Sequence, residues 1–392
     1  MTDPGSAEYD VVVVGLGALG SATAWELARR GSRVLGLERF ELGHSHGASH
    51  DTSRILRHSY HTPAYVRLTE HAYDDWARLE AASGQDLVSV VGGLDLFPRD
   101  AAIPMVDYTA SLDAVGIGYE LLDPSEIGRR WPQFALDQDV VGLFQERSAI
   151  VPAARGTKAM QDLARAHGAD LRDRSPVTAV ESLGPGRVRV STATDSWVVP
   201  QVVVCADAWT NQVLAGVGVD LPLEVTLEQA TYFRPESPER FAPSRMPLWI
   251  WMDDPCFYGF PTYGEPTIKA AQDCGGPVVD PDRRTSDVDA DRLALLAGQV
   301  GRLLPGSGDP VRSLRCQYTL TPDRDFVLDT VPGLEGSVFV GLGAGHGFKF
   351  APTFGRLLAD LALTGRTEAD VAAFRLDRPG LTDPGYGAHW LV

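Results

Sequence analysis

A glycine-rich turn between a strand and a helix constrains the fold of this chain more than any other feature. Gly15, Gly17 and Gly20 have the spacing G-x-G-x-x-G. Four consecutive valines end the segment 9–14 before them, and a segment with helical character, 22–30, follows them. Valine runs of this kind are typical of strands buried on both faces of a parallel sheet. The pattern therefore predicts strand, tight turn and helix, the start of a Rossmann-like unit.

The spacing of the three glycines predicts a dinucleotide site. Gly15 permits the tight turn, Gly17 lets a pyrophosphate approach the backbone, and Gly20 lets helix and strand pack closely. The helix N-terminus supplies unpaired N–H groups to the phosphates. A second strand, 33–37, follows the helix, and Glu38 stands at its end, where the carboxylate can accept hydrogen bonds from ribose hydroxyls.

The residue after Glu38 leaves the identity of the dinucleotide partly open. A carboxylate at this position repels a 2′-phosphate and so disfavours a phosphorylated ribose, whereas Arg39 beside it could pair with one. The glycine spacing itself does not distinguish nicotinamide from flavin.

A second glycine-rich turn near the C-terminus favours flavin. The segment 341–350 follows a short buried strand, 338–340, and opens a helix, so its N–H groups can bind an anion. A role in packing alone does not explain the histidine and lysine in this turn. Two such turns, far apart in the sequence, suit a long cofactor with a polar ring edge at its far end, as in FAD. The candidate residues of the turn are Gly343, Gly345, His346, Gly347 and Lys349.

Lysine is rare in this chain, and that rarity singles out candidates for a site. Of the 35 basic residues, only Lys158, Lys269 and Lys349 are lysine. Lysine is a compact point charge whose pKa shifts readily, whereas arginine stays charged. We therefore expect Lys269 and Lys349 to belong to a functional site. For Lys158, chance occurrence is an equally good explanation.

The composition predicts a globular, acidic protein. Hydrophobic residues make up 44% of 392, and the net charge of −17 opposes binding to nucleic acid or to anionic lipid. The segment 1–10 carries three acids and no base, unlike a signal peptide, and no stretch is apolar enough to span a membrane. The final residues, 389–392, match no retention signal. No C-x-x-C pair occurs among the four cysteines, so we expect a cytoplasmic protein with reduced thiols.

Patterns at the two ends of the chain predict a discontinuous domain. Strand, glycine turn and helix occur at both ends, whereas the segment 225–275 is rich in aromatic residues and proline with strand character. We expect an α/β fold with a Rossmann-like FAD-binding domain and an interleaved α+β substrate domain built on a mostly antiparallel sheet. The predicted boundaries are 1–85, 150–224 and 325–392 for the FAD-binding domain, and 86–149 and 225–324 for the substrate domain.

Six segments match one known pattern in order and spacing. They are the N-terminal fingerprint, Arg54-Ile-Leu-Arg57-His58, Tyr258-Gly-Phe-Pro261, Arg315-Cys316-Gln-Tyr318, Asp325-Phe-Val-Leu-Asp329 and Gly345-His-Gly-Phe-Lys-Phe350. Together they resemble the monomeric sarcosine oxidase and N-methyltryptophan oxidase family, part of the D-amino-acid-oxidase-like flavoproteins. The resemblance implies an FAD-dependent oxidase of a secondary amino acid, N-methyl or cyclic, that forms an imine and reduces O2 to H2O2. It also implies a small amino acid and O2 as partners, and a monomer or weak homo-oligomer.

The resemblance implies roles for residues at the matching positions. Cys316 would carry FAD through a thioether to the flavin 8α-methyl; the alternative is an ordinary buried thiol. Arg57 and Lys349 would bind the substrate carboxylate and stay unpaired until it arrives; their alternative is a surface salt bridge. Arg54 would lie near the flavin face, with His50 close by.

Further roles follow from the same resemblance, with two departures. Lys269 would lie near flavin N5, where a buried cation can stabilise developing superoxide. Tyr258 and Tyr318 would line the substrate cavity, with core packing as their alternative. Asp273 replaces a histidine that reaches the substrate in characterised members; it could hold an ammonium or reshape the pocket, so the substrate need not be sarcosine. The stretch 49–53 also departs from the family's usual Gly-Asp-Thr.

Two other functions stay open at this point. One is a flavin-dependent dehydrogenase or primary-amine oxidase acting on a larger amino acid in secondary metabolism. The other is a non-catalytic dinucleotide-binding regulator, which would convert no substrate.

Overall fold

A six-stranded sheet brings the two glycine-rich turns to one edge. The computed structural model describes residues 8–389, and the strand order of this sheet is β19-β20-β13-β1-β2-β9. Both β1 and β20 run parallel to β13, so their carboxyl ends lie at the same edge, where open α/β sheets bind ligands. Strands from the two ends of the chain thus share one sheet. Its strands are β1 (Val11–Val14), β2 (Val34–Leu37), β9 (Asp170–Arg172), β13 (Gln201–Val204), β19 (Val327–Thr330) and β20 (Val338–Leu342).

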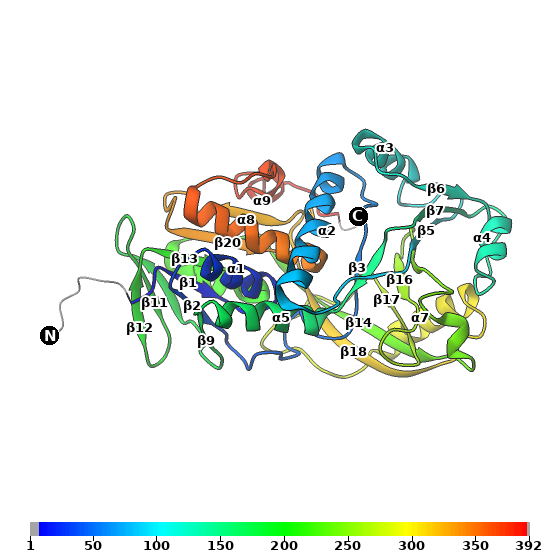
Figure 1. The fold of residues 1–392 in the computed structure, drawn as a ribbon, viewed down its shortest axis with the longest axis horizontal. Coiled ribbons are helices and arrows are strands. Elements are labelled where there is room, and N and C mark those ends of the chain that lie inside the picture. Colours follow the sequence, from blue (N-terminus) through cyan, green and yellow to red (C-terminus); the bar gives the residue numbers. More distant parts are fainter. Residues whose placement is uncertain (1–7, 390–392) are drawn as a thin grey trace.

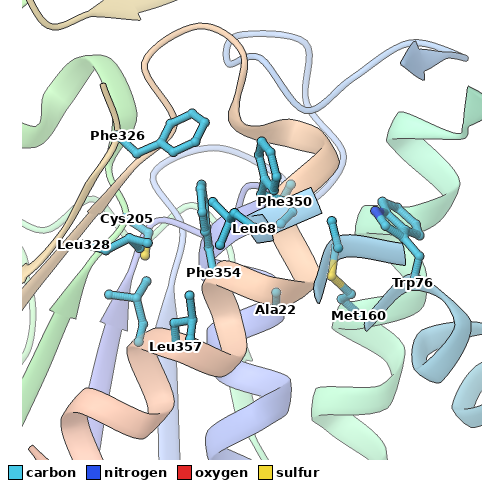
Figure 2. Packing of buried hydrophobic residues seen from close by; sticks show 14 of the residues in the cluster. Ala22, Leu68, Trp76, Met160, Cys205, Phe326, Leu328, Phe350, Phe354 and Leu357 are labelled. Carbon is cyan, nitrogen blue, oxygen red and sulfur yellow. The ribbon is translucent and has the colours of Figure 1, made fainter. Parts of the chain in front are cut away.

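Helices α1 (Ala18–Arg29) and α8 (Ala351–Thr364), each starting just after a glycine turn, pack against each other beside this sheet (Figure 1). The first begins within the fingerprint, four residues before the predicted start. The contact is close, because a Cβ on Gly355 would lie 2.4 Å from the Ala22 carbonyl carbon. Figure 2 shows Phe350 of the second glycine turn, and Phe354 and Leu357 of α8, in the surrounding apolar core.

Other helices and a small sheet complete this half of the molecule. Helix α5 packs on α1, and α2 contacts both α5 and α8. The segment 187–199 forms a hairpin that belongs to a three-stranded antiparallel sheet. The elements are α2 (Pro63–Ser83), α5 (Ala153–Ala166), β10 (Ala179–Ser182), β11 (Val188–Ser191), β12 (Ser196–Val199), η1 (Asp207–Trp209), α6 (Thr210–Leu214), η2 (Ala215–Val217), η4 (Gly347–Phe350), η5 (Ala372–Phe374) and α9 (Pro379–Thr382).

An eight-stranded sheet forms the other half, on the right of Figure 1. Its order is β18-β14-β17-β16-β15-β5-β7-β6, and every pair except β15 with β5 is antiparallel, which confirms the predicted sheet type. Its elements are β5 (Gly93–Phe97), α3 (Met105–Val115), β6 (Glu120–Leu122), α4 (Pro124–Arg130), β7 (Val141–Gln145), β14 (Glu224–Arg234), η3 (Pro238–Phe241), β15 (Leu248–Trp251), β16 (Phe257–Phe260), β17 (Ile268–Gln272), α7 (Ala290–Leu303) and β18 (Asp309–Leu320).

A short sheet of β3 (Arg54–Leu56), β8 (Ala149–Val151) and β4 (Ser89–Val90) completes the fold. The domain boundaries given above stay a prediction. Across the described part of the chain, no helix combines the length and the apolar character that crossing a membrane would require. The expectations about segments 1–10 and 389–392 fall mostly outside the described residues.

Candidate active site

One cavity joins the two glycine turns. It has a volume of about 910 Å³, and its walls include Gly15 and Gly17 of the first turn and Gly343, Gly345 and Lys349 of the second. This volume is at the upper end of the range for ligand pockets. The cavity therefore offers room for an extended ligand between the turns.

The three fingerprint glycines have different surroundings. Gly15 has φ +87°, and a Cβ on it would lie 2.5 Å from the Cys205 carbonyl oxygen. A Cβ on Gly20 would lie 1.8 Å from the Gly15 carbonyl oxygen, so Gly20 packs helix against turn. A Cβ on Gly17 would meet only the Ser49 side chain, with its hydroxyl oxygen at 3.1 Å. Of the three, Gly17 leaves open the space that a ligand's phosphates would need.

Glu38 is held by the backbone of the first turn. Its carboxylate accepts hydrogen bonds from the N–H groups of Leu16 (2.8 Å) and Phe40 (3.0 Å), and His44 Nε2 lies 3.3 Å away. Burial raises the pKa of Glu38, but hydrogen bonds from His44 and from the backbone outweigh it and lower the pKa overall. The carboxylate therefore stays ionised on the cavity wall, as an acceptor for hydroxyl groups.

Arg39 also lines the cavity, but its charge is already matched. Its guanidinium forms an ion pair with Asp282 at 2.9 Å and lies 5.2 Å from the ring centroid of Trp209. A 2′-phosphate would have to compete with this carboxylate.

The inner part of the cavity contains two buried cations against one tyrosine. Lys349 Nζ donates hydrogen bonds to the Tyr60 hydroxyl (2.7 Å) and the His346 carbonyl oxygen (2.9 Å). It lies 5.2 Å from the Tyr60 ring centroid, and the Arg57 guanidinium carbon lies 5.3 Å from the same centroid. Burial, reinforced by Arg57, holds the pKa of Lys349 well below its ordinary value. The His346 ring in turn contacts Tyr60, with Nδ1 3.1 Å from the hydroxyl oxygen.

The expectation that both cations stay unpaired is wrong for Arg57. Its guanidinium lies 3.3 and 3.4 Å from the two carboxylate oxygens of Asp95, and both side chains are buried. Burial would lower the pKa of Arg57, but Asp95 more than offsets this. Within residues 8–389, no carboxylate lies within ion-pair distance of Lys349. Sequence reasoning did not identify Asp95, which comes from β5 without a local motif.

Asp273 also has a partner that the sequence did not reveal. Both of its carboxylate oxygens accept hydrogen bonds from Arg324 Nη2, each at 2.9 Å, and Arg324 is only 1% exposed. Of the two roles considered for this carboxylate, holding a substrate ammonium would have to compete with an arginine, although both residues line the cavity. The one available signal was that Arg324 directly precedes the matched segment 325–329.

Lys269 belongs to a buried charge cluster behind the cavity wall. Its Nζ lies 2.5 Å from Asp51 Oδ2 and donates a hydrogen bond to the Ser53 carbonyl oxygen at 3.0 Å. Burial, aided by the charge of Arg54, lowers the pKa of Lys269 to about 8 although Asp51 opposes this. The Tyr232 hydroxyl donates to the other Asp51 oxygen. Asp51 and Tyr232 were not identified from the sequence, although Asp51 lies in the stretch that departs from the family pattern.

Arg54 fixes the loop that precedes it. Its guanidinium donates hydrogen bonds to the carbonyl oxygens of Ala48 (2.8 Å), His50 (3.0 Å) and Ser53 (2.8 Å). His50 lines the cavity, and its buried Nε2 has no hydrogen-bond partner within the described residues. Burial, aided by Arg54, lowers the pKa of His50 to about 4, so the imidazole is neutral at physiological pH.

Three further predicted residues lie on the same cavity wall. Cys316 on β18 is a partly buried free thiol, and burial raises its pKa. Tyr258 and Tyr318 are half-buried and line the cavity. The ring of Tyr318 packs on the second glycine turn, because a Cβ on Gly345 would lie 2.9 Å from it. The structure thus brings most of the predicted site residues to one cavity, with Gly20 and Lys269 behind its wall.

The residues present fit a flavin dinucleotide. A Cβ on Gly17 would intrude on the cradle of the first turn, and the orphaned His50 Nε2 offers a polar contact on the cavity wall. No group of three or more His, Cys, Asp or Glu side chains that could hold a metal ion occurs in the part of the chain that the structure describes.

Comparison with known proteins identifies the family. The family model described as FAD dependent oxidoreductase matches residues 10–361. Monomeric sarcosine oxidase of Streptomyces avermitilis is 35% identical, covering 94% of this chain and 97% of that protein; human peroxisomal sarcosine oxidase is 32% identical, covering 94% and 96%. The solved structure of NikD, described as an unusual amino acid oxidase essential for nikkomycin biosynthesis, superposes with a TM-score of 0.84 at 30% identity, covering 94% of this chain and 98% of NikD. The chain therefore belongs to the family of FAD dependent oxidoreductases, and its similarity to sarcosine oxidases extends over nearly its whole length.

Proposed function

We propose that this chain oxidises the C–N bond of a small secondary amino acid, N-methyl or cyclic, with O2 as the final electron acceptor. Bound FAD would supply the redox chemistry, taking a hydride equivalent from the carbon next to nitrogen and passing two electrons to O2 to give H2O2. The amine loses two electrons and two protons to become an imine, which water then hydrolyses. The chain's own residues bind and orient the amino acid.

The observation that carries this proposal is that the buried amine of Lys349 has no carboxylate partner among residues 8–389. Arg57 is matched by Asp95 and Arg324 by Asp273, whereas the hydrogen bonds of Lys349 go to the neutral oxygens of Tyr60 and His346. A buried ammonium without a counter-charge is costly, and a carboxylate bound beside it offsets that cost. The site therefore favours a ligand with one negative charge, such as the carboxylate of a neutral amino acid.

The position of Lys349 suggests that the protein contributes to catalysis mainly by orienting the substrate. Lys349 and Arg57 contact one tyrosine ring, so a carboxylate bound between them is held by two donors of fixed position. Fixing the carboxylate also fixes the amine two bonds away, which is a proximity effect. The sarcosine oxidases among the relatives, named for N-methylglycine, support a secondary amine.

The same proposal assigns the cofactor to the two turns. Gly15 and Gly17 would receive the diphosphate and Glu38 the ribose. Gly343, Gly345 and Gly347 would approach the ring edge; Cys316 would form a thioether to the flavin. Lys269 would assist the reaction of the reduced flavin with O2, and Tyr258 and Tyr318 would line the substrate cavity.

An assay of hydrogen peroxide tests this function. Purified flavoprotein is supplied with sarcosine, larger N-methyl amino acids, L-proline and L-pipecolate, each beside its primary-amine counterpart. We expect peroxide from at least one secondary amino acid. Turnover restricted to primary amines, or dependent on an artificial acceptor instead of O2, contradicts it. A cytoplasmic location and a monomeric or weakly oligomeric state also stay predictions.

A further inference from the structure

Tyr60 lies at the centre of a chain of hydrogen bonds on the cavity wall. Its hydroxyl oxygen is 2.7 Å from Lys349 Nζ and 3.1 Å from His346 Nδ1. The other ring nitrogen of His346, Nε2, lies 3.0 Å from the carbonyl oxygen of Arg324. Tyr60 is only 1% exposed, and its ring stacks on that of Tyr65 with 4.9 Å between the centroids. Tyr60 lies outside the six matched segments, so its role has to follow from the direction of these hydrogen bonds.

The carbonyl oxygen of Arg324 sets that direction. A carbonyl oxygen only accepts, so His346 Nε2 carries the ring proton and donates it. Burial, reinforced by the charge of Arg324, holds the pKa of His346 well below its ordinary value, so the ring is neutral and Nδ1 is an acceptor. The Tyr60 hydroxyl group therefore donates its hydrogen to Nδ1 and keeps an oxygen lone pair for Lys349.

Both ends of Lys349 are held by the surrounding protein. Trp76 is buried on α2, and its Nε1 donates a hydrogen bond to the carbonyl oxygen of Lys349 at 2.8 Å. At the other end, Nζ donates to the Tyr60 hydroxyl oxygen and, at 2.9 Å, to the carbonyl oxygen of His346, and it makes no third hydrogen bond within residues 8–389. Tyr60, His346 and Lys349 all line the cavity. The one remaining position on the tetrahedral nitrogen is therefore left for a ligand in the cavity.

This arrangement gives the Tyr60 hydroxyl group a task in substrate binding. We propose that Tyr60, oriented by His346, is a positioning residue that holds Lys349 with its remaining N–H directed at the substrate carboxylate. The inference rests on the proposed function and names a residue that serves it. Tyr60 acts through Lys349, because its own hydrogen is already donated to His346. Its oxygen also stabilises the protonated amine, which forms stronger hydrogen bonds than the neutral one.

Binding of acetate to the flavoprotein tests this role without turnover. Protein with FAD bound is titrated with acetate at a series of pH values, and flavin absorbance reports both the FAD content and the dissociation constant. The unmodified chain is compared with Tyr60→Phe, Lys349→Met and the double variant. Phenylalanine keeps the stacked ring and removes only the hydroxyl group.

We expect Tyr60→Phe to change how acetate binding depends on pH. Loss of an acceptor destabilises the protonated form of Lys349, so the decline in affinity with rising pH begins about one pH unit lower than in the unmodified chain. Above that pH the dissociation constant is about tenfold higher, as for a lost hydrogen bond to a charged group. In the Lys349→Met background, Tyr60→Phe has no further effect.

The matched control is Tyr73→Phe. The Tyr73 ring also stacks on a neighbour, His58, with 4.3 Å between the centroids, and its hydroxyl group donates to the carbonyl oxygen of Arg147 at 2.9 Å. Tyr73 does not line the cavity. We expect this control to leave the dissociation constant of acetate and its pH dependence unchanged.

Three results overturn the positioning role. One is failure of acetate to bind the unmodified protein. Another is equal weakening by Tyr60→Phe at every pH, because a purely structural change would act in this way. The third is an effect of Tyr60→Phe that persists in Lys349→Met, since the hydroxyl group would then act on the anion directly or through another group. The charged and titratable groups nearby are Arg57, Asp95, Asp273, Arg324, Asp325 and His346.

A second variant keeps the proposal testable should Tyr60→Phe fail to fold. His346→Leu removes the acceptor that orients the Tyr60 hydroxyl group, so the pH dependence is expected to shift in the same direction, and only when Lys349 is present. No shift contradicts the proposal. These results are separate from the oxidation itself: peroxide formation without the shift rejects the positioning role alone, whereas the shift without oxidation of any secondary amino acid rejects the proposed function alone.

Discussion

Lys349 donates a hydrogen bond to the hydroxyl oxygen of Tyr60 over 2.7 Å, and this neutral contact replaces the ion pair that a buried lysine ordinarily requires. When protonated, an amine held in this way favours an incoming anion, because binding gains a strong charge-assisted hydrogen bond and no carboxylate among residues 8–389 has to be displaced. The contrast with Arg57, which Asp95 already neutralises, makes Lys349 the residue that sets the charge of the ligand.

Lys349→Met removes this charge while keeping a side chain of similar length. We expect the KM for the amino acid to rise about 10- to 100-fold, as for the loss of a charge-assisted hydrogen bond, with FAD retained. Steady-state kinetics and the flavin absorbance measure the two effects. Arg129→Met is the control, because Arg129 is a cation on α4 whose side chain is 71% exposed. An unchanged KM for every amino acid that is turned over would exclude the anchor.

The lowered pKa of Lys349 predicts how carboxylate binding depends on pH. Binding requires the protonated amine, so affinity is greatest below the pKa of Lys349 in the free protein and falls as pH rises through it. Burial has moved this pKa well below its ordinary value, so the loss begins at lower pH than for an exposed lysine. The dissociation constant of a non-oxidisable carboxylate such as acetate, measured from flavin absorbance, is expected to rise by up to about tenfold per pH unit above that pKa. We expect Lys349→Met to abolish this dependence of the dissociation constant on pH. If the dependence persists in the variant, another titrating group causes it.

Lys269 has a structural and a proposed chemical role, and the two can be separated. Lys269→Met leaves Asp51 buried without its nearest cation, so we expect a loss of about 3–5 kcal/mol in unfolding free energy. The reaction of the reduced flavin with O2 is expected to slow as well. Asp51→Asn in the same chain removes the orphaned charge, and asparagine tolerates the positive φ of this residue, +78°.

The double variant should therefore regain stability without regaining the rate with O2. Stopped-flow measurement of each half-reaction and denaturant unfolding separate these outcomes. If stability and the rate with O2 recover together, Lys269 affects the reaction with O2 only by stabilising the fold.

Cys316 is predicted to hold the flavin covalently. Acid precipitation of the unmodified protein should carry the yellow colour into the pellet, whereas Cys316→Ala should release it into the supernatant. Cys274→Ala is the control for loss of a thiol, because Cys274 is buried and does not line the cavity. Colour released by acid from the unmodified protein rules out the linkage.

The predictable part of the site lies in local patterns. The turns at Gly15, Gly17 and 341–350 could be recognised from short sequence segments, because a tight turn before a helix is specified by adjacent residues. That the turns meet follows from parallel pairing of β1 and β20 with β13, since parallel strands end at one edge.

The ion pairs could not be predicted in the same way. Asp51 meets Lys269, Asp95 meets Arg57, and Asp273 meets Arg324, each across strands or loops distant in sequence. With 52 acidic residues and 35 basic ones, the chain offers many possible pairs, and only the packing of sheets selects among them.

Anaerobic titration of the flavin absorbance shows whether oxidation requires the carboxylate of a secondary amino acid. Sarcosine, L-proline and L-pipecolate are compared with their decarboxylated counterparts dimethylamine, pyrrolidine and piperidine. We expect at least one of the acids to bleach the flavin at millimolar concentration while its amine does not. Bleaching by the amines at equal concentration, or no bleaching by any secondary amino acid, contradicts it.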